Sequence, residues 1–216
     1  MLLLEIKNMR VFFFTFLFLV FSARAQELSS FNQQRLQTDQ RLMVTLGSWS
    51  AVNFIGSGIG WALSEPGEAR YFHQMNVYWN VVNAALAIPG YFKSRNSDPS
   101  LTTAETIRMQ YKTEKTFLFN AGLDLTYMTA GFMLRNDAKY NVEKRDQLNG
   151  FGNSLLLQGG FLFIFDVAAH VIHAKHRTKK LEPLLDKLTL SSTGLGLRFE
   201  LSPTPQKTLI PITTQE

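Results

Sequence analysis

Two aspartates and a histidine are the side chains of this sequence best suited to chemistry. Asp124, Asp166 and His170 lie in long stretches that otherwise carry almost no charge. If the helices alternate in direction, Asp124 lies at about the same depth as Asp166 and His170. In a low-dielectric layer these groups have shifted proton affinities, so they could bind a cation or pass protons. The simpler interpretation is an Asp–His pair that neutralises itself near an interface.

A second polar set follows helical spacing along two of the same stretches. It comprises His73, Asn76, Asn80, Asn83, Asn149 and Asn153. The first four fall on one stripe of a helix, and the last two begin a similar stripe. An amide in hydrocarbon needs a partner, so these stripes should face other helices. Each such hydrogen bond contributes about 0.6–2 kcal/mol, and we expect this polar seam to be structural.

No cofactor or metal is predicted. The sequence contains no cysteine, which excludes disulfides and thiolate chemistry. Asp166, His170 and His173 share one helical side, but a metal site needs more partners. His73 and His170 should lie roughly 30–35 Å apart along parallel helices, too far for one haem. A nucleophile elbow, a phosphate loop and HExxH are also missing, so an enzyme is not the favoured interpretation.

Four nearly uncharged stretches carry these side chains, and each is long enough to cross a bilayer. They are Leu42–Leu63, Tyr71–Phe92, Thr116–Leu134 and Gln147–Ala174. A soluble bundle needs a charged outer face on each helix, and these stretches are nearly uncharged all round. The sequence therefore predicts an all-α membrane protein, in which two tandem helical hairpins form a four-transmembrane-helix bundle.

Turn and cap signals separate the four stretches. Ser64-Glu65-Pro66-Gly67 predicts a turn after the first. Ile88-Pro89-Gly90 closes the second, because proline cannot continue the hydrogen-bond ladder without a kink. Thr102 or Thr103 resembles an N-cap, with Glu105 in the first turn of a helix that leads into the third stretch.

The two halves of the bundle share a sequence pattern. Gln74-x-Asn76-xxx-Asn80 recurs as Gln147-x-Asn149-xxx-Asn153. This predicts an internal repeat of two helices, whose copies would be related by a pseudo-twofold axis along the membrane normal. Coincidence among asparagine-rich helices is the alternative.

The N-terminus has the features of a secretory signal peptide over residues 1–25. Arg10 is followed by the apolar run Val11–Phe21 and by Ala23-Arg24-Ala25, which fits the small-x-small pattern of a cleavage site. Either Met1 or Met9 is the start, and an uncleaved anchor helix is the alternative. The membrane domain is predicted over residues 26–180.

The C-terminal region changes period. Leu188, Leu190, Leu195 and Leu197 alternate with polar or small residues, which predicts a short β-hairpin over residues 181–201. An outer-membrane strand is disfavoured, because a single hairpin cannot close a barrel. Residues 202–216 contain three prolines and are predicted to be a disordered tail.

Charge points to a lipid partner. The net charge of +5 and pI near 9.5 could suggest nucleic acid. However, the lysines and arginines flank the apolar stretches, so we predict the lipid bilayer and no nucleic acid. A homo-oligomer or an envelope protein is the further partner left open. The connector charges reverse the usual positive-inside bias, so orientation is open too.

The run from His73 to Asn83, HQMNVYWNVVN, resembles an uncharacterised family of small bacterial membrane proteins that bear a domain of unknown function. The resemblance covers Phe31 to His176 and implies fold and location, but no activity. We therefore predict an integral membrane protein of the bacterial cell envelope, in the inner membrane after export, with a structural or binding role. The alternative is a small transporter or membrane enzyme that uses Asp124, Asp166 and His170.

Overall fold

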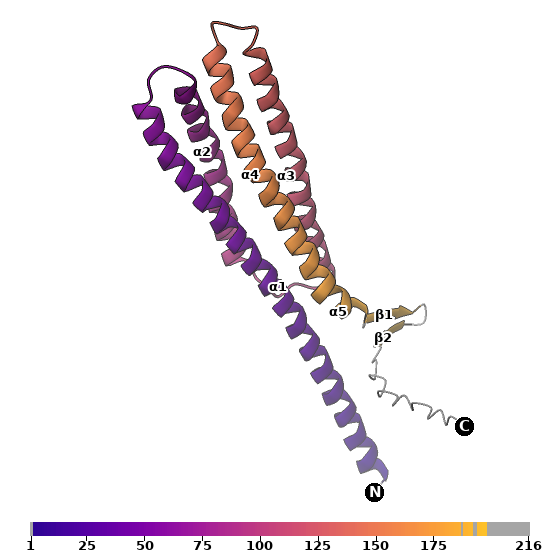
Figure 1. Cartoon of the computed structure of the whole chain (residues 1–216). Coiled ribbons are helices and arrows are strands. Elements are labelled where there is room, and N and C mark those ends of the chain that lie inside the picture. The colour runs from indigo at the N-terminus through magenta and orange to yellow at the C-terminus, as the bar shows by residue number, and fades with distance from the viewer. Residues whose placement is uncertain (1, 187, 192–193, 198–216) are drawn as a thin grey trace, which may run out of the picture.

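Four long helices form two antiparallel hairpins that pack side by side (Figure 1). In the computed structural model α1 spans Leu2–Leu63, α2 Glu68–Asn96, α3 Thr103–Asp137 and α4 Arg145–His176. The structure describes residues 2–186, 188–191 and 194–197, with side chains from residue 25 to residue 186. α1 pairs with α2 and α3 with α4, while α2 packs on α4 and joins the hairpins. The predicted helical bundle is confirmed.

Local sequence signals set most of the helix ends. Gly67 has a φ of 155°, a conformation that favours glycine, and it reverses the chain between α1 and α2. At the start of α3, the Thr102 hydroxyl accepts the Glu105 N–H, and the Glu105 carboxylate accepts the Thr102 N–H. Pro89 does not end α2, which continues to Asn96. The predicted stop at Pro89 is therefore wrong.

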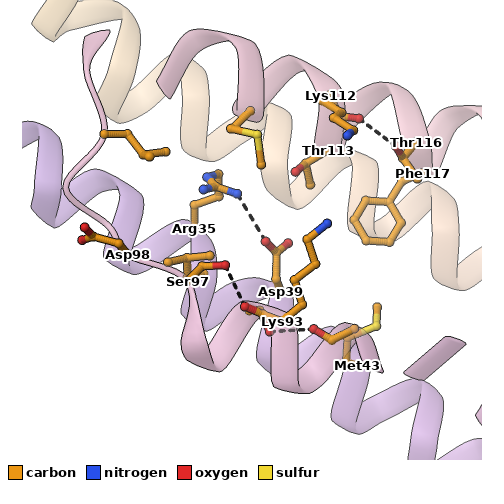
Figure 2. Close-up of a pocket in the computed structure, with 15 residues that line it drawn as sticks. Arg35, Asp39, Met43, Lys93, Ser97, Asp98, Lys112, Thr113, Thr116 and Phe117 are labelled. Atoms are coloured by element: carbon orange, nitrogen blue, oxygen red, sulfur yellow. Dashed lines mark hydrogen bonds and ion pairs between the residues drawn. The ribbon is translucent and has the colours of Figure 1, made fainter. Parts of the chain in front are cut away.

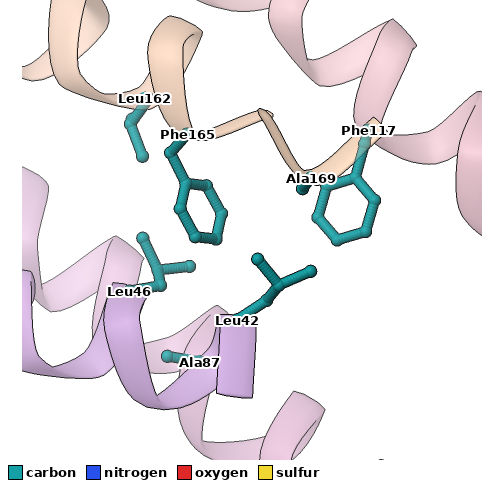
Figure 3. Packing of buried hydrophobic residues seen from close by; sticks show 7 residues of the cluster. All are labelled: Leu42, Leu46, Ala87, Phe117, Leu162, Phe165 and Ala169. Atoms are coloured by element: carbon teal, nitrogen blue, oxygen red, sulfur yellow. The ribbon is translucent and has the colours of Figure 1, made fainter. Parts of the chain in front are cut away.

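An apolar cluster in the middle of the bundle draws on all four helices (Figure 3). It consists of Leu42 and Leu46 of α1, Ala87 of α2, Phe117 of α3, and Leu162, Phe165 and Ala169 of α4. Phe117 and Phe165 meet edge to face, with ring centroids 6.3 Å apart. The hairpins are thus held together by packing as well as by the polar contacts described below.

Glycines allow α3 and α4 to approach closely. A Cβ added to Gly131 would lie 2.8 Å from the Gly152 carbonyl oxygen, and one added to Gly152 would lie 2.7 Å from that of Gly131. About two turns further along α4, a Cβ on Gly159 would lie 3.1 Å from the Asp124 carbonyl oxygen. This close contact brings the backbone of Asp124 against the helix that carries Asp166.

The described bundle places many polar side chains inside and large apolar side chains outside. Asn80 and Gln158 are fully buried, whereas Val52 and Ile164 are each 70% exposed and Phe119 is 68% exposed. Further exposed apolar side chains include Ile55, Ile59, Leu63, Val81, Val82, Leu86, Leu118, Phe132, Met133 and Ile172. Soluble monomers rarely expose large contiguous apolar surfaces.

Two helical runs are long and apolar enough to cross a bilayer, among the residues that the structure describes. They are Ala25–Leu63 and Arg145–Asp186. The sequence predicts four spans. Only α1 and α4 contain a described run that meets this requirement of length and composition, and α2 and α3 do not. In α2 the reason is the set of amides at Asn76, Asn80 and Asn83, which lowers the average hydropathy of an otherwise apolar helix. Crossing of a membrane is taken up below as a proposal.

The β part of the predicted fold class needs correction. The packed body of the described chain is helical, and α4 continues through a π-helical turn, Arg177–Leu181 (η1), into α5, Glu182–Asp186. The predicted hairpin segment thus begins as helix. Beyond it, Leu188–Ser191 (β1) and Gly194–Leu197 (β2) pair antiparallel, and β1 contacts α5. A two-stranded ribbon is marginal on its own, so the alternating leucines add no β component to the architecture.

The N-terminal prediction falls on a continuous helix. α1 begins at Leu2, continues past Ala25 and projects beyond the rest of the bundle (Figure 1). Signal-peptide cleavage after Ala25 stays a prediction. The predicted tail over residues 202–216 lies outside the described residues.

Candidate functional site

Gln158 of α4 is the centre of a buried hydrogen-bond network. Its side-chain nitrogen donates to the Oδ1 atoms of Asn76 at 2.8 Å and Asn53 at 3.4 Å. Its Oε1 accepts the indole N–H of Trp49 at 2.9 Å and the side-chain amide of Asn83 at 3.4 Å. Because Gln158 is fully buried, these bonds replace the water that its amide has lost.

The network extends from Gln158 along α1 and α2. Asn76 donates to Ser57 Oγ at 3.1 Å and accepts from Ser154 Oγ at 2.8 Å. The Asn80 amide donates to the Asn76 carbonyl oxygen at 2.8 Å, while Ser50 Oγ donates to the Asn80 carbonyl oxygen at 2.6 Å. The amide layer comprises Trp49, Ser50, Asn53, Ser57, Asn76, Asn80, Asn83, Ser154 and Gln158.

Three of the six predicted seam residues lie in the amide layer, namely Asn76, Asn80 and Asn83. The other three lie apart from it. Asn153 donates to Glu68 Oε1 at 2.7 Å near the end of the bundle, the ring of His73 lies against Gly60, and Asn149 lines a separate cavity.

Sequence reasoning missed the α4 members of the amide layer. Ser154 and Gln158 are four residues apart, so they share one helix face, and both are fully buried. That spacing was the available signal. The prediction instead used Asn149 and Asn153, which lie on a neighbouring face of the same helix.

The structure brings Asp124 and Asp166 together and leaves His170 apart. Both carboxyl groups are buried, at 3% and 5% exposed. They line one cavity of about 270 Å³ between the helices. His170 Nδ1 instead lies 3.0 Å from the Glu114 carbonyl oxygen, and His170 does not line that cavity.

The carboxyl pair has the chemistry of a shared proton. Two buried carboxyl groups in one cavity favour a proton on one of them, because two adjacent buried negative charges are unfavourable. Asn120 lines the same cavity, and Asp124 Oδ2 has no hydrogen-bond partner among the described residues. Within the described residues, no group of three or more His, Cys, Asp or Glu is arranged to hold a metal ion.

A second polar region lies nearer the charged ends of the helices. The basal cluster comprises Asn32, Arg35 and Asp39 of α1, Thr106, Gln110 and Glu114 of α3, His173 of α4, and Arg177 of η1. Glu114 Oε1 accepts from Gln110 at 2.9 Å and from Arg177 Nε at 2.9 Å. This hydrogen bond to Glu114 is the main cause that raises the pKa of Arg177. Asn32 donates to Thr106 Oγ1 at 2.7 Å, which ties α1 to α3.

Several basal groups are only partly paired. Arg35 is 3% exposed, its NH1 lies 3.5 Å from Asp39 Oδ2, and its Nε has no partner among the described residues. Burial lowers the pKa of Arg35, and the charge of Asp39 partly opposes that change. His173 Nε2 lies 3.1 Å from Asp39 Oδ1, within ion-pair range, but the ring is not aligned for a hydrogen bond.

One family model matches the chain over residues 45–167. Its description is "Family of unknown function (DUF6992)". No curated protein and no solved structure gives a significant match. The matched segment contains the amide layer and both members of the carboxyl pair, whereas Arg35 and His173 of the basal cluster lie outside it. The predicted relationship to an uncharacterised family is confirmed, while a bacterial origin and a membrane location remain predictions.

Proposed function

Because the chain belongs to the DUF6992 family of unknown function, we propose a role from its geometry. It is an integral membrane protein of the bacterial cell envelope, with a structural or binding role. Its helical bundle lies in the inner membrane, which the chain reaches by signal-peptide-directed export. The amide layer fixes the packing of the helices.

The inverted distribution of polar and apolar side chains carries this proposal. Gln158 and Asn80 are fully buried, while Ile164 and Val52 are each 70% exposed on the outer faces of α4 and α1. In water, this arrangement would lose the hydrophobic stabilisation of the exposed side chains and would bury amides at a cost. In a bilayer, lipid covers the outer faces and the amides pair with one another between helices.

The amide layer explains how such a bundle selects one packing. Lipid chains are as apolar as leucine, so burying apolar side chains does little to drive helices together in a membrane. Hydrogen bonds between α1, α2 and α4 supply directional contacts, and Gln158 alone reaches Trp49, Asn53 and Asn76 on two other helices. A shift of α4 by one residue would break all three.

Location is tested by extraction of membranes that contain the full chain. After expression in a bacterial host, membranes are washed with alkaline carbonate and then with detergent. We expect the chain to stay in the carbonate pellet and to dissolve in detergent. Release by carbonate would contradict the proposal, because a chain that crosses the bilayer is held by its lipid contacts.

A substitution at Ile164 tests which solvent surrounds the bundle. Translocon insertion scales put arginine at the centre of a membrane helix at about 2.5–3.5 kcal/mol unfavourable, so Ile164→Arg should lower membrane-inserted yield strongly. On a water-exposed face the same change is worth about 0.5 kcal/mol or less. Ile164→Leu serves as the matched control. Equal yields of Ile164→Arg and Ile164→Leu would argue against lipid at this face.

The carboxyl pair supports a second candidate function, a proton pathway. The supporting observation is that Asp124 and Asp166, both buried, line one cavity of about 270 Å³. A pair that shares a proton can release and regain it without any other titrating group. His170 has no place in this arrangement, because its ring faces the Glu114 backbone.

Proton movement is measured in vesicles that contain the purified chain and a trapped pH-sensitive dye. Under the second candidate, an imposed pH gradient decays faster with the parent chain than with empty vesicles. Asp166→Asn and Asp124→Asn should each abolish the difference, whereas Asp146→Asn at the exposed start of α4 should preserve it. If both pair variants fold and conduct like the parent, the proton pathway is excluded.

A further inference from the structure

A cavity of about 480 Å³ opens beside the basal cluster, between α1, the end of α2 and the start of α3. Figure 2 shows side chains from all three helices around it, with Arg35 and Asp39 joined on one side and Phe117 on the other. A cavity of this size suits a small organic ligand or the headgroup of a larger one.

The charged lining of the cavity has an excess of cations. Arg35, Lys93 and Lys112 line it together with two carboxylates, Asp39 and Asp98. Asp39 is shared, since it faces Arg35 NH1 at 3.5 Å and His173 Nε2 at 3.1 Å. One carboxylate therefore serves two neighbours, and positive charge is left over in the cavity.

Arg35 is the strongest indication of a missing anion. Arg35 is only 3% exposed. Its one side-chain hydrogen bond to a described residue is the 3.5 Å contact with Asp39. Guanidinium groups are always charged and carry five N–H donors. Arg35 Nε is buried without a partner among the described residues. An unpaired buried donor is costly, and an anionic ligand would relieve that cost.

The remainder of the lining is apolar. Leu36, Met43, Met109 and Phe117 face the same cavity. Methionine side chains adapt to flexible apolar groups. A ligand that satisfies both parts of the cavity must therefore carry an anionic end and an apolar end.

The cavity also lies where the apolar stretches end. Met43 and Phe117 belong to the predicted spans, whereas Arg35 and Lys112 precede them in α1 and α3, and Lys93 follows the span of α2. In the membrane location proposed above, on which this inference rests, the cavity crosses the boundary between lipid chains and headgroups. Basic pockets between membrane helices at this depth hold anionic headgroups.

We propose that this cavity binds the phosphate headgroup of an anionic phospholipid. The phosphate lies among Arg35, Lys93 and Lys112, and the first part of an acyl chain lies against Met43 and Phe117. Free phosphate shares the headgroup chemistry but leaves the apolar lining uncovered. The lipid fits both parts of the lining and is therefore the ligand that we assign.

The test uses the full chain in neutral detergent with three probes of matched solubility. These are dihexanoyl phosphatidylglycerol, dihexanoyl phosphatidylcholine and inorganic phosphate, and binding is followed by calorimetry. We expect saturable binding of the phosphatidylglycerol, and at least tenfold weaker binding of the other two. Equal affinity for inorganic phosphate would overturn the lipid assignment, and equal affinity for the phosphatidylcholine would overturn the role of net charge.

Lysine variants locate the site without disturbing the buried arginine. Lys112→Gln should weaken phosphatidylglycerol binding about fivefold, the value of one cationic side chain near an anionic headgroup. Lys115→Gln, three residues along α3 and outside this cavity, should change it less than twofold. Equal losses in the two variants would reduce the effect to surface charge and overturn the assigned site. Lys93→Gln provides an independent repeat on α2.

Failure of this inference can be distinguished from failure of the proposed location. Binding in detergent does not depend on membrane insertion, so absent phosphatidylglycerol binding by a chain that stays in the carbonate pellet rejects the site alone. Release of the chain by carbonate rejects the proposed location and, with it, the lipid as the natural ligand.

Discussion

The amide layer and the basal cluster both bury polar side chains, but they differ in how completely those groups are paired. Gln158 exchanges hydrogen bonds with four neighbouring side chains. In the basal cluster, Arg35 Nε and Gln110 Oε1 have no partner among the described residues. A saturated network requires nothing from outside and specifies packing, whereas an unsaturated one retains capacity for a ligand.

The two regions also differ in charge. The amide layer contains only neutral side chains, while the basal cluster contains Arg35, Asp39, Glu114 and Arg177. Neutral amides tolerate the middle of a bilayer better than charges do, and charges near helix ends reach headgroups and water. Position along the bundle therefore separates the polar residues into a structural set and a set suited to binding.

The largest expected effect comes from removing the centre of the amide layer. Gln158→Leu leaves Trp49 Nε1 without its partner and removes one of the hydrogen bonds to Asn76. We expect the free energy of unfolding to fall by about 2–4 kcal/mol. Unfolding is followed by titration with sodium dodecyl sulfate in mixed micelles. Gln147→Leu, on the same helix but outside the amide layer, should stay within about 0.5 kcal/mol of the parent. A comparable loss in both variants would mean that the layer has no special role.

A smaller effect is expected at Glu114 of the basal cluster, because its partner Arg177 is partly exposed. Glu114→Gln exchanges charge-assisted hydrogen bonds from Arg177 and Gln110 for weaker neutral ones. We expect a loss of about 1–2 kcal/mol in the same titration. Glu143→Gln in the exposed connector is the control. A loss larger than that of Gln158→Leu would reverse the ranking of the two regions.

The smallest expected effect is a dependence of stability on pH that arises at His176, beside the basal cluster. Burial lowers the pKa of His176 from its ordinary value of 6.5, and the positive charges of His173, Lys180 and Arg35 lower it further. The folded state therefore favours the neutral ring. Stability is fully present above the ordinary pKa and is lost as pH falls through the lowered pKa of the folded state.

His176→Phe isolates this contribution. The ring of His176 stacks on Phe31, with centroids 4.4 Å apart, and phenylalanine keeps the stacking but cannot be protonated. Unfolding free energies at pH 7.5 and pH 5 should differ less in the variant than in the parent. An unchanged difference would assign the acid sensitivity to other groups.

The sequence predicts one side of the amide layer better than the other. Asn76, Asn80 and Asn83 recur at helical spacing on an otherwise apolar helix, so their inward direction follows from periodicity. Their partners on α4 depend on how that helix is rotated. Gly150 packs on the α2 backbone, where an added Cβ would lie 2.5 Å from the Glu68 carbonyl oxygen. That contact turns Ser154 and Gln158 inward and leaves Asn153 at the side.

The carboxyl pair shows the same division. Alternation of the helices places Asp124 and Asp166 at similar depth, and this could be reasoned from the chain order alone. Whether a neighbouring side chain joins them depends on rotation about the helix axis. His170 is one turn beyond Asp166, yet its ring turns to the Glu114 carbonyl oxygen at 3.0 Å.

The basal cluster could not be predicted from the sequence. Its members come from segments that individually resemble polar connectors, and they meet because α1 and α3 extend past the apolar stretches as continuous helices. Asn32 and Thr106 are 74 residues apart in the chain but only 2.7 Å apart in the fold. Similarly, the alternating leucines near the C-terminus predict strand conformation, but the segment begins as helix, and the two-stranded ribbon beyond it is marginal on its own.

The most direct test of the central claim, that lipid surrounds the apolar outer faces, is a measurement of solvent at Ile164. The chain contains no cysteine, so Ile164→Cys accepts a single nitroxide label, and Glu143→Cys in the exposed connector provides the control. In lipid vesicles we expect the label at position 164 to collide frequently with oxygen and rarely with a water-soluble nickel chelate, and the label at position 143 to show the opposite. Frequent nickel collisions at position 164 would contradict a membrane-embedded bundle.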